Sequence, residues 1–329
     1  MSSPSQYNWP AIGNERAIEF LEKAIANEKI AQTYVFAGPA DLGKSTIAIA
    51  FARNLQGNPE GFNSDLHILQ AEEGKKNISI EQVREFIKIL NLSSFLNSYK
   101  IGIIKEAERL TPEAQSALLK TLEEPREKVI VILLVTNEES LPATILSRSQ
   151  ILYFMPVASA LIYDYLIKNY GANRSLAKDL ANLSLGRPLQ AVRYLESGAE
   201  YKDYLEKAEV WLNFFHQDLN TRLSSLDKLF SDKSFSRQAA TSALEVLLLG
   251  EGLLRDLLLL SLGQNDRVQH SALSDSLAQA LNQLETASDH NSGPIILANL
   301  KLIAQAKEYL SANVNPRLVL EQVLMNLAL

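Results

Sequence analysis

The sequence contains no cysteine and only four histidines among its 329 residues. The lack of cysteine excludes disulfides, thiol catalysis and zinc sites with cysteine ligands. The four histidines are scattered along the chain, and their spacing does not match a metal-binding motif. We therefore expect no zinc, and any catalytic chemistry must use other side chains.

Long apolar runs are also missing. The most apolar stretch, residues 243–263, is interrupted by four charged side chains, namely Glu245, Glu251, Arg255 and Asp256. The stretch is therefore typical of a buried helix and not of a membrane span. The first six residues are polar and lack the apolar core of a signal peptide. We expect a cytoplasmic protein with no membrane partner.

A strong charge imbalance is absent as well. The formal net charge is −6, and the chain has 21% charged and 47% hydrophobic residues. This composition is ordinary for a soluble globular protein, and the length allows two or three domains. A chain with this charge does not attract nucleic acid as a whole. Contact with DNA must therefore come from a local patch or from partner proteins.

Residues 38–46 read Gly-Pro-Ala-Asp-Leu-Gly-Lys-Ser-Thr and fit the phosphate-binding template Gly, four residues, Gly-Lys-Ser. A β-type run precedes them at 34–37, and a helical run follows from Ser45 to Asn54. In this context the backbone N–H groups and the helix N-terminus can surround a phosphate. A glycine-containing turn with an exposed lysine is the alternative interpretation, and the full template disfavours it.

The template assigns a role to each residue of the loop. Lys44 would reach the β and γ phosphates, and Ser45 would offer its hydroxyl to Mg²⁺. We therefore expect ATP or ADP, with Mg²⁺ as a possible metal, at a pocket formed by Gly38, Gly43, Lys44, Ser45 and Thr46.

Apolar runs alternate with helical patterns through the first half of the chain. Strands are predicted at 34–37, 66–69, 100–104, 129–135 and 151–154, and helices at 14–27, 45–54, 78–92 and 111–124. Thr111 is the expected N-cap of the last of these helices, with Pro112 at its first position and Pro125 at its end. Residues 58–64 are expected to form a loop. This alternation predicts an α/β fold, with a parallel sheet covered by helices on both faces.

The β signal ends near residue 157. Short helical runs follow at 158–170, 175–185 and 189–197, and everything from about residue 201 onward reads as helical. We therefore divide the chain into a nucleotide-binding domain at 1–157, a small helical lid at 158–200, and an all-helical C-terminal domain at 201–329.

Several stretches match one family in order and spacing. Residues 100–108, at the Walker B position, read Lys-Ile-Gly-Ile-Ile-Lys-Glu-Ala-Glu. Residues 118–125, on the next helix, read Leu-Leu-Lys-Thr-Leu-Glu-Glu-Pro. Further matches are Ser-Arg-Ser at 147–149, Arg-Asp-Leu-Leu-Leu-Leu at 255–260 and Asn-Val-Asn-Pro-Arg-Leu at 313–318. Together these stretches resemble the clamp-loader subunits of the AAA+ family, and in particular the delta-prime subunits of bacterial DNA polymerase III. The resemblance covers essentially the whole chain.

This resemblance implies a P-loop AAA+ domain, a helical lid and a helical collar for oligomerisation. It implies partners too: the ATPase subunits and delta subunit of a clamp loader, and through that complex the sliding clamp and primed DNA. Arg148 would be presented in trans to a neighbour's nucleotide, although an intramolecular ion pair with Glu123 or Glu124 remains open. Thr136 and Asn137 would form the polar sensor of the γ-phosphate, or would cap a strand end in the ordinary way.

The sequence departs from the family in two places. Many members carry a four-cysteine zinc module, but residues 56–64 are short and contain no cysteine. Where working ATPases of this superfamily have Asp-Glu after the Walker B strand, this chain has Lys105-Glu106. The Asp helps to hold Mg²⁺ and the Glu orients water, so only the water-orienting acid remains. The alternatives for Lys105 are an ion pair with Glu106 or Glu108 and a position in solvent, and the metal-binding Asp is missing in each case.

The loss of that Asp predicts weak or absent hydrolysis. Two unit charges about 4 Å apart interact by roughly 4 kcal/mol at an effective dielectric near 20. An ammonium in place of the carboxylate turns the attraction of Mg²⁺ into a repulsion of that order. The alternative is an active motor subunit, in which Glu106 and an altered metal shell suffice. A P-loop kinase is a third candidate, which the helical lid and C-terminal domain disfavour. Arg187 is not assigned a catalytic role, because Leu189 aligns better with the family's second sensor.

Overall fold

The structure is a computed structural model of the chain. It describes residues 7–9, 12–57, 65–72, 74–92, 99–123, 126–231, 234, 236–287 and 291–328. The chain packs as two compact units, Met1–Tyr165 with Gly186–Gln190, and Leu166–Leu185 with Ala191–Leu329. The expected division into three domains stays a prediction. The expected loop at 58–64 and helix stop at Pro125 lie outside the described residues.

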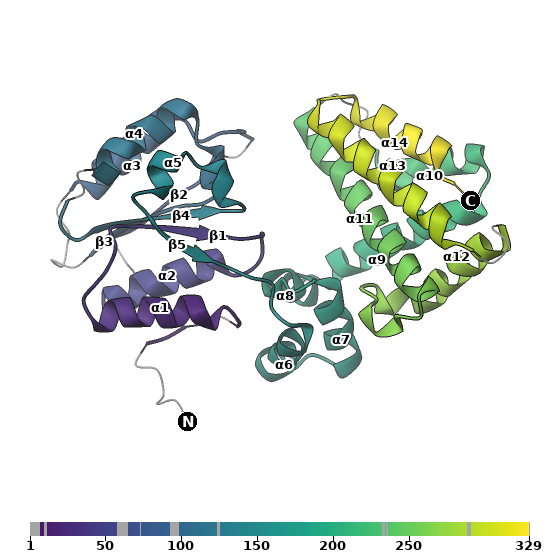
Figure 1. Ribbon diagram of the computed structural model, residues 1–329, viewed down its shortest axis with the longest axis horizontal. Coiled ribbons are helices and arrows are strands. Elements are labelled where there is room, and N and C mark those ends of the chain that lie inside the picture. Colours follow the sequence, from purple (N-terminus) through teal and green to yellow (C-terminus); the bar gives the residue numbers. More distant parts are fainter. Residues whose placement is uncertain are drawn as a thin grey trace. The chain divides into compact units, whose positions relative to one another are not determined.

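The first unit is built on a five-stranded parallel sheet in the order β2-β3-β4-β1-β5 (Figure 1). Its strands are β1 (Thr33–Ala37), β2 (Leu66–Leu69), β3 (Lys100–Ile104), β4 (Val129–Val135) and β5 (Gln150–Tyr153). The three inner strands, β1, β3 and β4, are buried along their whole length. Strands covered on both faces are apolar throughout, which is the pattern that made them recognisable in the sequence.

Helices cover both faces of this sheet. In Figure 1, α1 (Glu15–Ala26) and α2 (Lys44–Leu55) lie on one side, and α3 (Ile80–Leu90), α4 (Pro112–Glu123) and α5 (Ala143–Leu146) lie on the other. Strand β1 serves both faces because its side chains alternate. Tyr34 and Phe36 belong to the core under α1 and α2, and Val35 and Ala37 to the core under α3 and α4.

Local capping fixes where two of these helices begin. The Thr111 hydroxyl accepts a hydrogen bond from the Ala114 N–H at 3.2 Å, and Pro112 is the first residue of α4, as predicted. At the start of α3, Ser79 and Gln82 form a reciprocal capping box. Two short 3₁₀ turns, η1 (Ala107–Arg109) and η2 (Glu138–Ser140), follow β3 and β4 at the carboxyl edge of the sheet. This edge carries the candidate site.

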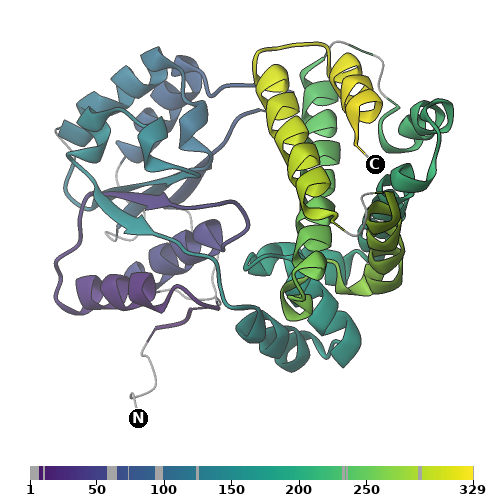
Figure 2. The same cartoon turned by 45° about the vertical axis from the view of Figure 1, so that its right-hand side comes forward.

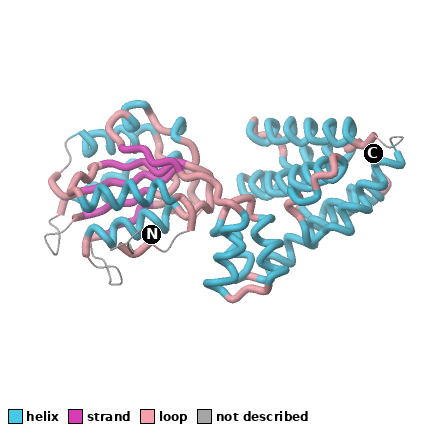
Figure 3. The backbone as a smooth tube through the Cα atoms, turned by 60° about the horizontal axis from the view of Figure 1, so that its bottom comes forward, coloured by secondary structure: helices cyan, strands magenta, loops and turns pink. Residues whose placement is uncertain are grey.

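The described part of the second unit is helical and contains no strand (Figure 3). The helices from the end of the first unit onward are α6 (Ser159–Tyr170), α7 (Arg174–Leu183), α8 (Pro188–Glu196), α9 (Gly198–Leu212), α10 (Leu219–Leu229), α11 (Arg237–Ser261), α12 (Ser274–Ala287), α13 (Gly293–Ser311) and α14 (Pro316–Asn326). Short 3₁₀ turns join some of them: η3 (Asn213–His216), η4 (Asn265–Arg267) and η5 (Ser271–Leu273).

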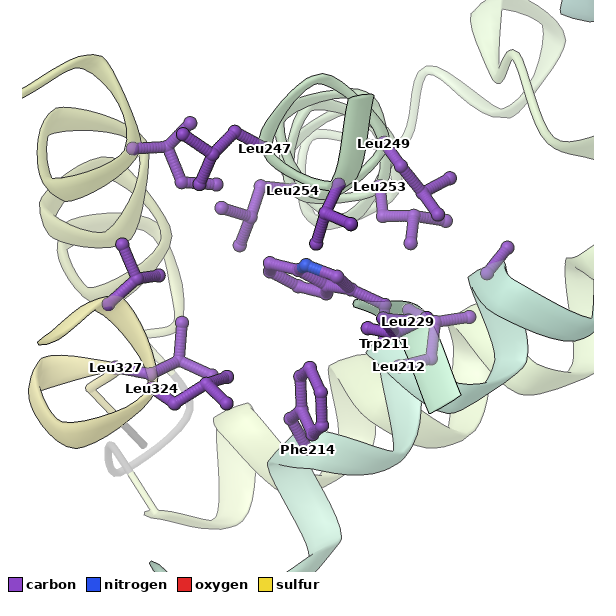
Figure 4. Close-up of a cluster of buried hydrophobic side chains, with 14 of the residues drawn as sticks. Trp211, Leu212, Phe214, Leu229, Leu247, Leu249, Leu253, Leu254, Leu324 and Leu327 are labelled. Carbon is purple, nitrogen blue, oxygen red and sulfur yellow. The ribbon is translucent and has the colours of Figure 1, made fainter. Parts of the chain in front are cut away.

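The long helix α11 is the centre of this unit and packs along α13 (Figure 2). Leu253 and Leu254 of α11 lie over the indole of Trp211, and Phe214 follows beneath it (Figure 4). The charged residues that interrupt the apolar stretch all lie on this 25-residue helix. Within the described residues, no helix is long and apolar enough to cross a membrane. Residues 243–261 are therefore helical, as predicted, with one face in the core, whereas residues 262 and 263 lie beyond the end of the helix.

Candidate nucleotide-binding site

The loop at 38–43 joins β1 to α2 at the carboxyl edge of the sheet. Gly38 has φ +149°, and a Cβ there would lie 2.3 Å from the carbonyl oxygen of Phe154. Gly43 has φ +86° and is the N-cap of α2. Side chains rarely adopt such backbone angles, so both positions require glycine. The strand–loop–helix context that the sequence motif demands is present.

Lys44 is buried and turned back onto this loop. Its ammonium donates hydrogen bonds to the carbonyl oxygens of Gly38 and, at 2.6 Å, of Pro39. Burial lowers the pKa of Lys44, and the nearby carboxylates of Glu108 and Asp41 oppose that shift. The loop therefore holds one cation close to the N-terminus of α2. Ser45 and Thr46 are partly buried in the first turn of that helix, so their hydroxyls lie at the same edge.

The two residues after β3, Lys105 and Glu106, do not form an ion pair beside Lys44. Glu106 has φ +49°, and its carboxylate pairs with the guanidinium of Arg109. Arg109 also donates to the carbonyl oxygen of Lys76 at 2.6 Å. Neither of the ion pairs considered for Lys105, with Glu106 or with Glu108, is formed in the described part of the chain. Glu106 is thus held by Arg109, so its role as a water-orienting acid stays a prediction.

The acid beside Lys44 that sequence reasoning missed is Glu108, in the turn η1. Its Oε1 accepts hydrogen bonds from the Thr136 hydroxyl at 2.9 Å and from the Thr136 N–H at 3.3 Å. Its Oε2 is buried and has no hydrogen-bond partner among the described residues. The only sequence signal was the Glu-Ala-Glu spacing, because either acid could face the loop until the turn beyond β3 is known.

Thr136 and Asn137, the expected polar sensor, have different contacts. Thr136 directly follows β4 and bonds to Glu108. The side-chain oxygen of Asn137 accepts a hydrogen bond from the Glu139 N–H at 3.1 Å and so caps η2. For Asn137 these contacts match the alternative interpretation of ordinary strand-end capping. The sensor role of both residues stays a prediction.

Arg148 is the exposed middle residue of the Ser-Arg-Ser motif, just after α5. Its Nη2 is 3.1 Å from Glu123 Oε1, and its Nη1 donates to the carbonyl oxygen of Thr144 at 3.0 Å. The intramolecular pair considered from the sequence is therefore formed with Glu123, while Glu124 lies outside the described residues. The two side chains are 39% and 50% exposed. Exposed pairs of this kind contribute about 0–1 kcal/mol, so a stronger anion can displace Glu123.

Residues 186–190 contact the phosphate loop through the backbone. The Leu189 N–H donates to the carbonyl oxygen of Asp41 at 3.2 Å, and the Val157 N–H donates to the carbonyl oxygen of Gly186 at 2.9 Å. Leu189, which we expected at the second-sensor position, is therefore next to the loop. Its side chain is apolar, so it cannot serve as a charged sensor.

A parallel sheet with a phosphate-binding loop after its β1, followed by a helical segment that contacts this loop, defines a P-loop protein of the AAA+ class. Comparison with known proteins gives a narrower assignment. Residues 13–158 match the family model described as "DNA polymerase III, delta subunit". The chain is 26% identical over 329 residues, 95% of both chains, to DNA polymerase III subunit delta' of Bacillus subtilis (strain 168). It is 36% identical over 135 residues, 41% of both chains, to DNA polymerase III subunit delta' of Haemophilus influenzae.

A solved structure agrees with the fold. The gamma subunit-related protein of DNA polymerase III from Thermotoga maritima matches with a TM-score of 0.50 at 20% identity, over 93% of this chain and 97% of that one. The chain is therefore similar over nearly its whole length to a delta' subunit of bacterial DNA polymerase III.

Proposed function

We propose that this chain is a clamp-loader subunit that binds a nucleotide, hydrolyses it slowly or not at all, and completes a neighbour's ATP site with Arg148. It would assemble with the ATPase subunits and the delta subunit and help to load the sliding clamp onto primed DNA. The observation that carries the proposal is an intact phosphate loop together with Lys105, in place of an acid, directly after β3. The end-to-end similarity to delta' subunits supports the assembly.

The residues present fit a nucleotide with Mg²⁺. Lys44 and the first turn of α2 would hold the phosphates, and the Ser45 hydroxyl would face the metal. Glu108 Oε2 is a buried acceptor without a partner in the part of the chain that the structure describes. When bound, Mg²⁺ would neutralise charge on the phosphates. No cluster of three or more His, Cys, Asp or Glu residues that could hold a metal by itself occurs among the described residues.

Slow hydrolysis follows from the two residues after β3. Lys105 places a positive charge where a metal-binding acid is needed, and Glu106 is held by Arg109 at the surface. Hydrolysis needs a nucleophilic water to be oriented as well as a metal to be held. Both functions are weakened at once in this chain, while the contacts that bind phosphate are kept.

The isolated chain should bind ADP or ATP and show no turnover above background with Mg²⁺. Lys44→Ala should weaken nucleotide affinity by at least about tenfold, or ~1.4 kcal/mol, because the cation held by the loop is lost. Binding is measured by calorimetry and turnover by phosphate release. The control is Lys120→Ala, an exposed lysine on α4. Fast turnover that Lys44→Ala abolishes would contradict the proposal and establish the motor alternative, which the presence of Glu108 near Lys44 favours.

Arg148→Ala should leave the folding and nucleotide binding of this chain unchanged and slow ATP hydrolysis by the assembled complex. The rate should fall severalfold, limited by the sites that Arg148 does not complete, because an arginine supplied in trans stabilises charge in the transition state. The measurement is steady-state ATPase activity of the reconstituted clamp loader.

Two further variants make the Arg148 experiment specific. Arg84→Ala removes an exposed arginine from α3 of the same unit and should not change the rate. Glu123→Ala removes the partner of Arg148 and should not lower the rate either, because the pair within the chain has to open before Arg148 reaches a neighbour. An unchanged rate with Arg148→Ala removes the trans role.

A further inference from the structure

Glu108 has an unusual combination of contacts for an acid that no sequence motif marks. One carboxylate oxygen is fixed by two donors of Thr136, and the other is buried without a hydrogen-bond partner within the described residues. A buried acceptor without a partner costs about 1–3 kcal/mol, and more when it is charged. Such a group is expected to meet a donor or a cation in some state of the protein.

The surroundings of Glu108 place it at the phosphate loop. Strands β1 and β4 are neighbours, with Ala37 paired to Val135, so the residues that follow each strand, Gly38 and Thr136, come together. The Gly38 N–H donates to the Val135 carbonyl at 3.2 Å. The Gly38 carbonyl in turn binds the Lys44 ammonium. A continuous series of contacts along one edge of the sheet therefore links Glu108, Thr136, Gly38 and Lys44.

Lys44 does not supply the missing partner. Its ammonium is bonded to the carbonyl oxygens of Gly38 and Pro39 and forms no ion pair with Glu108 within the described residues. Among the residues that the structure describes, Lys105 is not paired with Glu108 either. A cation that arrives with the ligand would supply such a partner. A hydrated Mg²⁺ is suitable, because it keeps several of its waters and is bound in proteins through few carboxylates together with the phosphates of a substrate.

We propose that Glu108 is the carboxylate that attracts the divalent cation of a bound nucleotide, acting through a water of the cation's shell and taking the place of the acid missing at Lys105. The proposal rests on the nucleotide site proposed above. Glu108 is then a positioning residue: Thr136 holds its Oε1, and its Oε2 faces the cation. Glu106 remains with Arg109, so cation binding is retained without a positioned acid for hydrolysis.

This role predicts that the Glu108 charge affects ADP affinity in opposite directions with and without the divalent cation, whereas a purely structural role does not. Without a divalent cation, a carboxylate near the phosphates repels the nucleotide. With the cation, the same carboxylate attracts the metal that the phosphates share. Replacing Glu108 with an uncharged side chain should therefore strengthen binding of metal-free ADP and weaken binding of Mg²⁺–ADP. A residue that only supports the fold would lower both affinities together.

The experiment measures ADP affinity of the full chain by calorimetry, once with excess Mg²⁺ and once with EDTA. In Glu108→Gln the amide oxygen can still accept from Thr136, while the charge is removed. The ratio of the two dissociation constants, EDTA over Mg²⁺, should fall by about tenfold relative to wild type, or ~1.4 kcal/mol. Glu113→Gln removes an equal charge at the exposed start of α4 and should leave the ratio unchanged. Asp41→Asn tests the other acid near Lys44, which lies in the phosphate loop itself.

Each outcome decides a separate point. An unchanged ratio in Glu108→Gln, with normal ADP binding, overturns the role of Glu108 and leaves the proposed function standing. The same fall in Asp41→Asn but not in Glu108→Gln assigns the cation to Asp41 and overturns the proposal too. If the wild type binds no ADP in either condition, the nucleotide site itself fails, and this inference fails with it. If Glu108→Gln does not fold, Glu108→Asp keeps the charge and withdraws it from the cation, and it should lower only the affinity measured with Mg²⁺.

Discussion

Replacing Asp256 with leucine is expected to reduce the free energy of unfolding of the helical unit by about 3–5 kcal/mol, because each buried donor that loses its acceptor costs about 1–3 kcal/mol. Asp256 lies on α11 and its side chain is completely buried. Its Oδ1 accepts a hydrogen bond from the Gln269 N–H at 3.0 Å, and its Oδ2 accepts one from the His270 N–H at 2.8 Å. Leucine would leave both donors buried without an acceptor.

The ring of His270 increases the expected loss. Its Nδ1 is 2.7 Å from Asp256 Oδ2 and its Nε2 is 2.8 Å from the hydroxyl of Tyr204. We assign the proton to Nδ1, so that the ring donates to Asp256 and accepts from Tyr204. Burial raises the pKa of Tyr204, which keeps its hydroxyl protonated as a donor. Without Asp256 the ring loses the acceptor that fixes its tautomer, and the stacked Tyr204 ring loses a fixed neighbour.

Urea unfolding followed by fluorescence measures this loss, because Trp211 lies in the core of the same unit. The matched control is Asp266→Leu, an exposed acid in η4, which should change the stability by less than about 0.5 kcal/mol. A double-mutant cycle with His270→Ala isolates the interaction between the two side chains. A loss below 1 kcal/mol for Asp256→Leu, on the scale of an ordinary surface change, would contradict the account of this network.

Replacing Arg222 with methionine is expected to cost about 3 kcal/mol, since a buried guanidinium that donates to several carbonyls has no apolar equivalent. Arg222 Nε donates to the carbonyl oxygens of Phe214 at 2.8 Å and Gln217 at 3.0 Å. Its Nη1 donates to those of Leu324 and Leu327, at 3.4 and 3.3 Å. One side chain thus ties the turn η3 to the C-terminal end of α14.

The electrostatic setting of Arg222 explains why it tolerates burial. Burial lowers the pKa of Arg222, and Asp218 partly opposes the shift. The carbonyl oxygens at the end of α14 carry the negative end of the helix dipole, which favours a cation there. Methionine fills a similar space but leaves these carbonyls without donors.

Chemical unfolding and hydrogen exchange of α14 together test the Arg222 prediction. In Arg222→Met the amides of α14 should lose protection along with the global loss of stability. Arg222→Lys should recover less than half of the loss, because a single ammonium cannot reach carbonyls on both elements. Lys228→Met, an exposed cation on the same helix, serves as the control. Full recovery by lysine would show that charge alone matters and that the fork of the guanidinium does not.

The sheet was predictable from the sequence because its strands are apolar runs with sharp boundaries. The runs at 66–69, 100–104 and 129–135 coincide with β2, β3 and β4. Strand β5 begins one residue earlier than predicted, at Gln150, because its pairing with β1 extends to a polar residue at the edge of the sheet. The position of the phosphate loop was predictable for the same reason, since the glycine spacing lies between a clear strand and a clear helix.

The arrangement of acids around that loop was not predictable. Glu106 and Glu108 are two residues apart, and the direction of each depends on the positive φ of Glu106 and on the 3₁₀ turn that follows. A sequence pattern contains neither of these angles. The partner of Arg148 raised a similar difficulty. The motif fixes where the arginine lies in the chain, whereas its pairing with Glu123 depends on how α4 and α5 pack.

The chain passes between its two compact units three times, after Tyr165, after Leu185 and after Gln190. A shortened protein that ends at Tyr165 would lack the Leu189 N–H that bonds to the phosphate loop and the Gly186 carbonyl that bonds to Val157. One that ends at Gln190 would keep both, but would carry α7 without its later partners, such as the Ser271 hydroxyl that donates to Asp179 at 2.7 Å. A nucleotide-binding half that keeps all of its own hydrogen bonds must therefore also carry α7, a helix that belongs to the other unit.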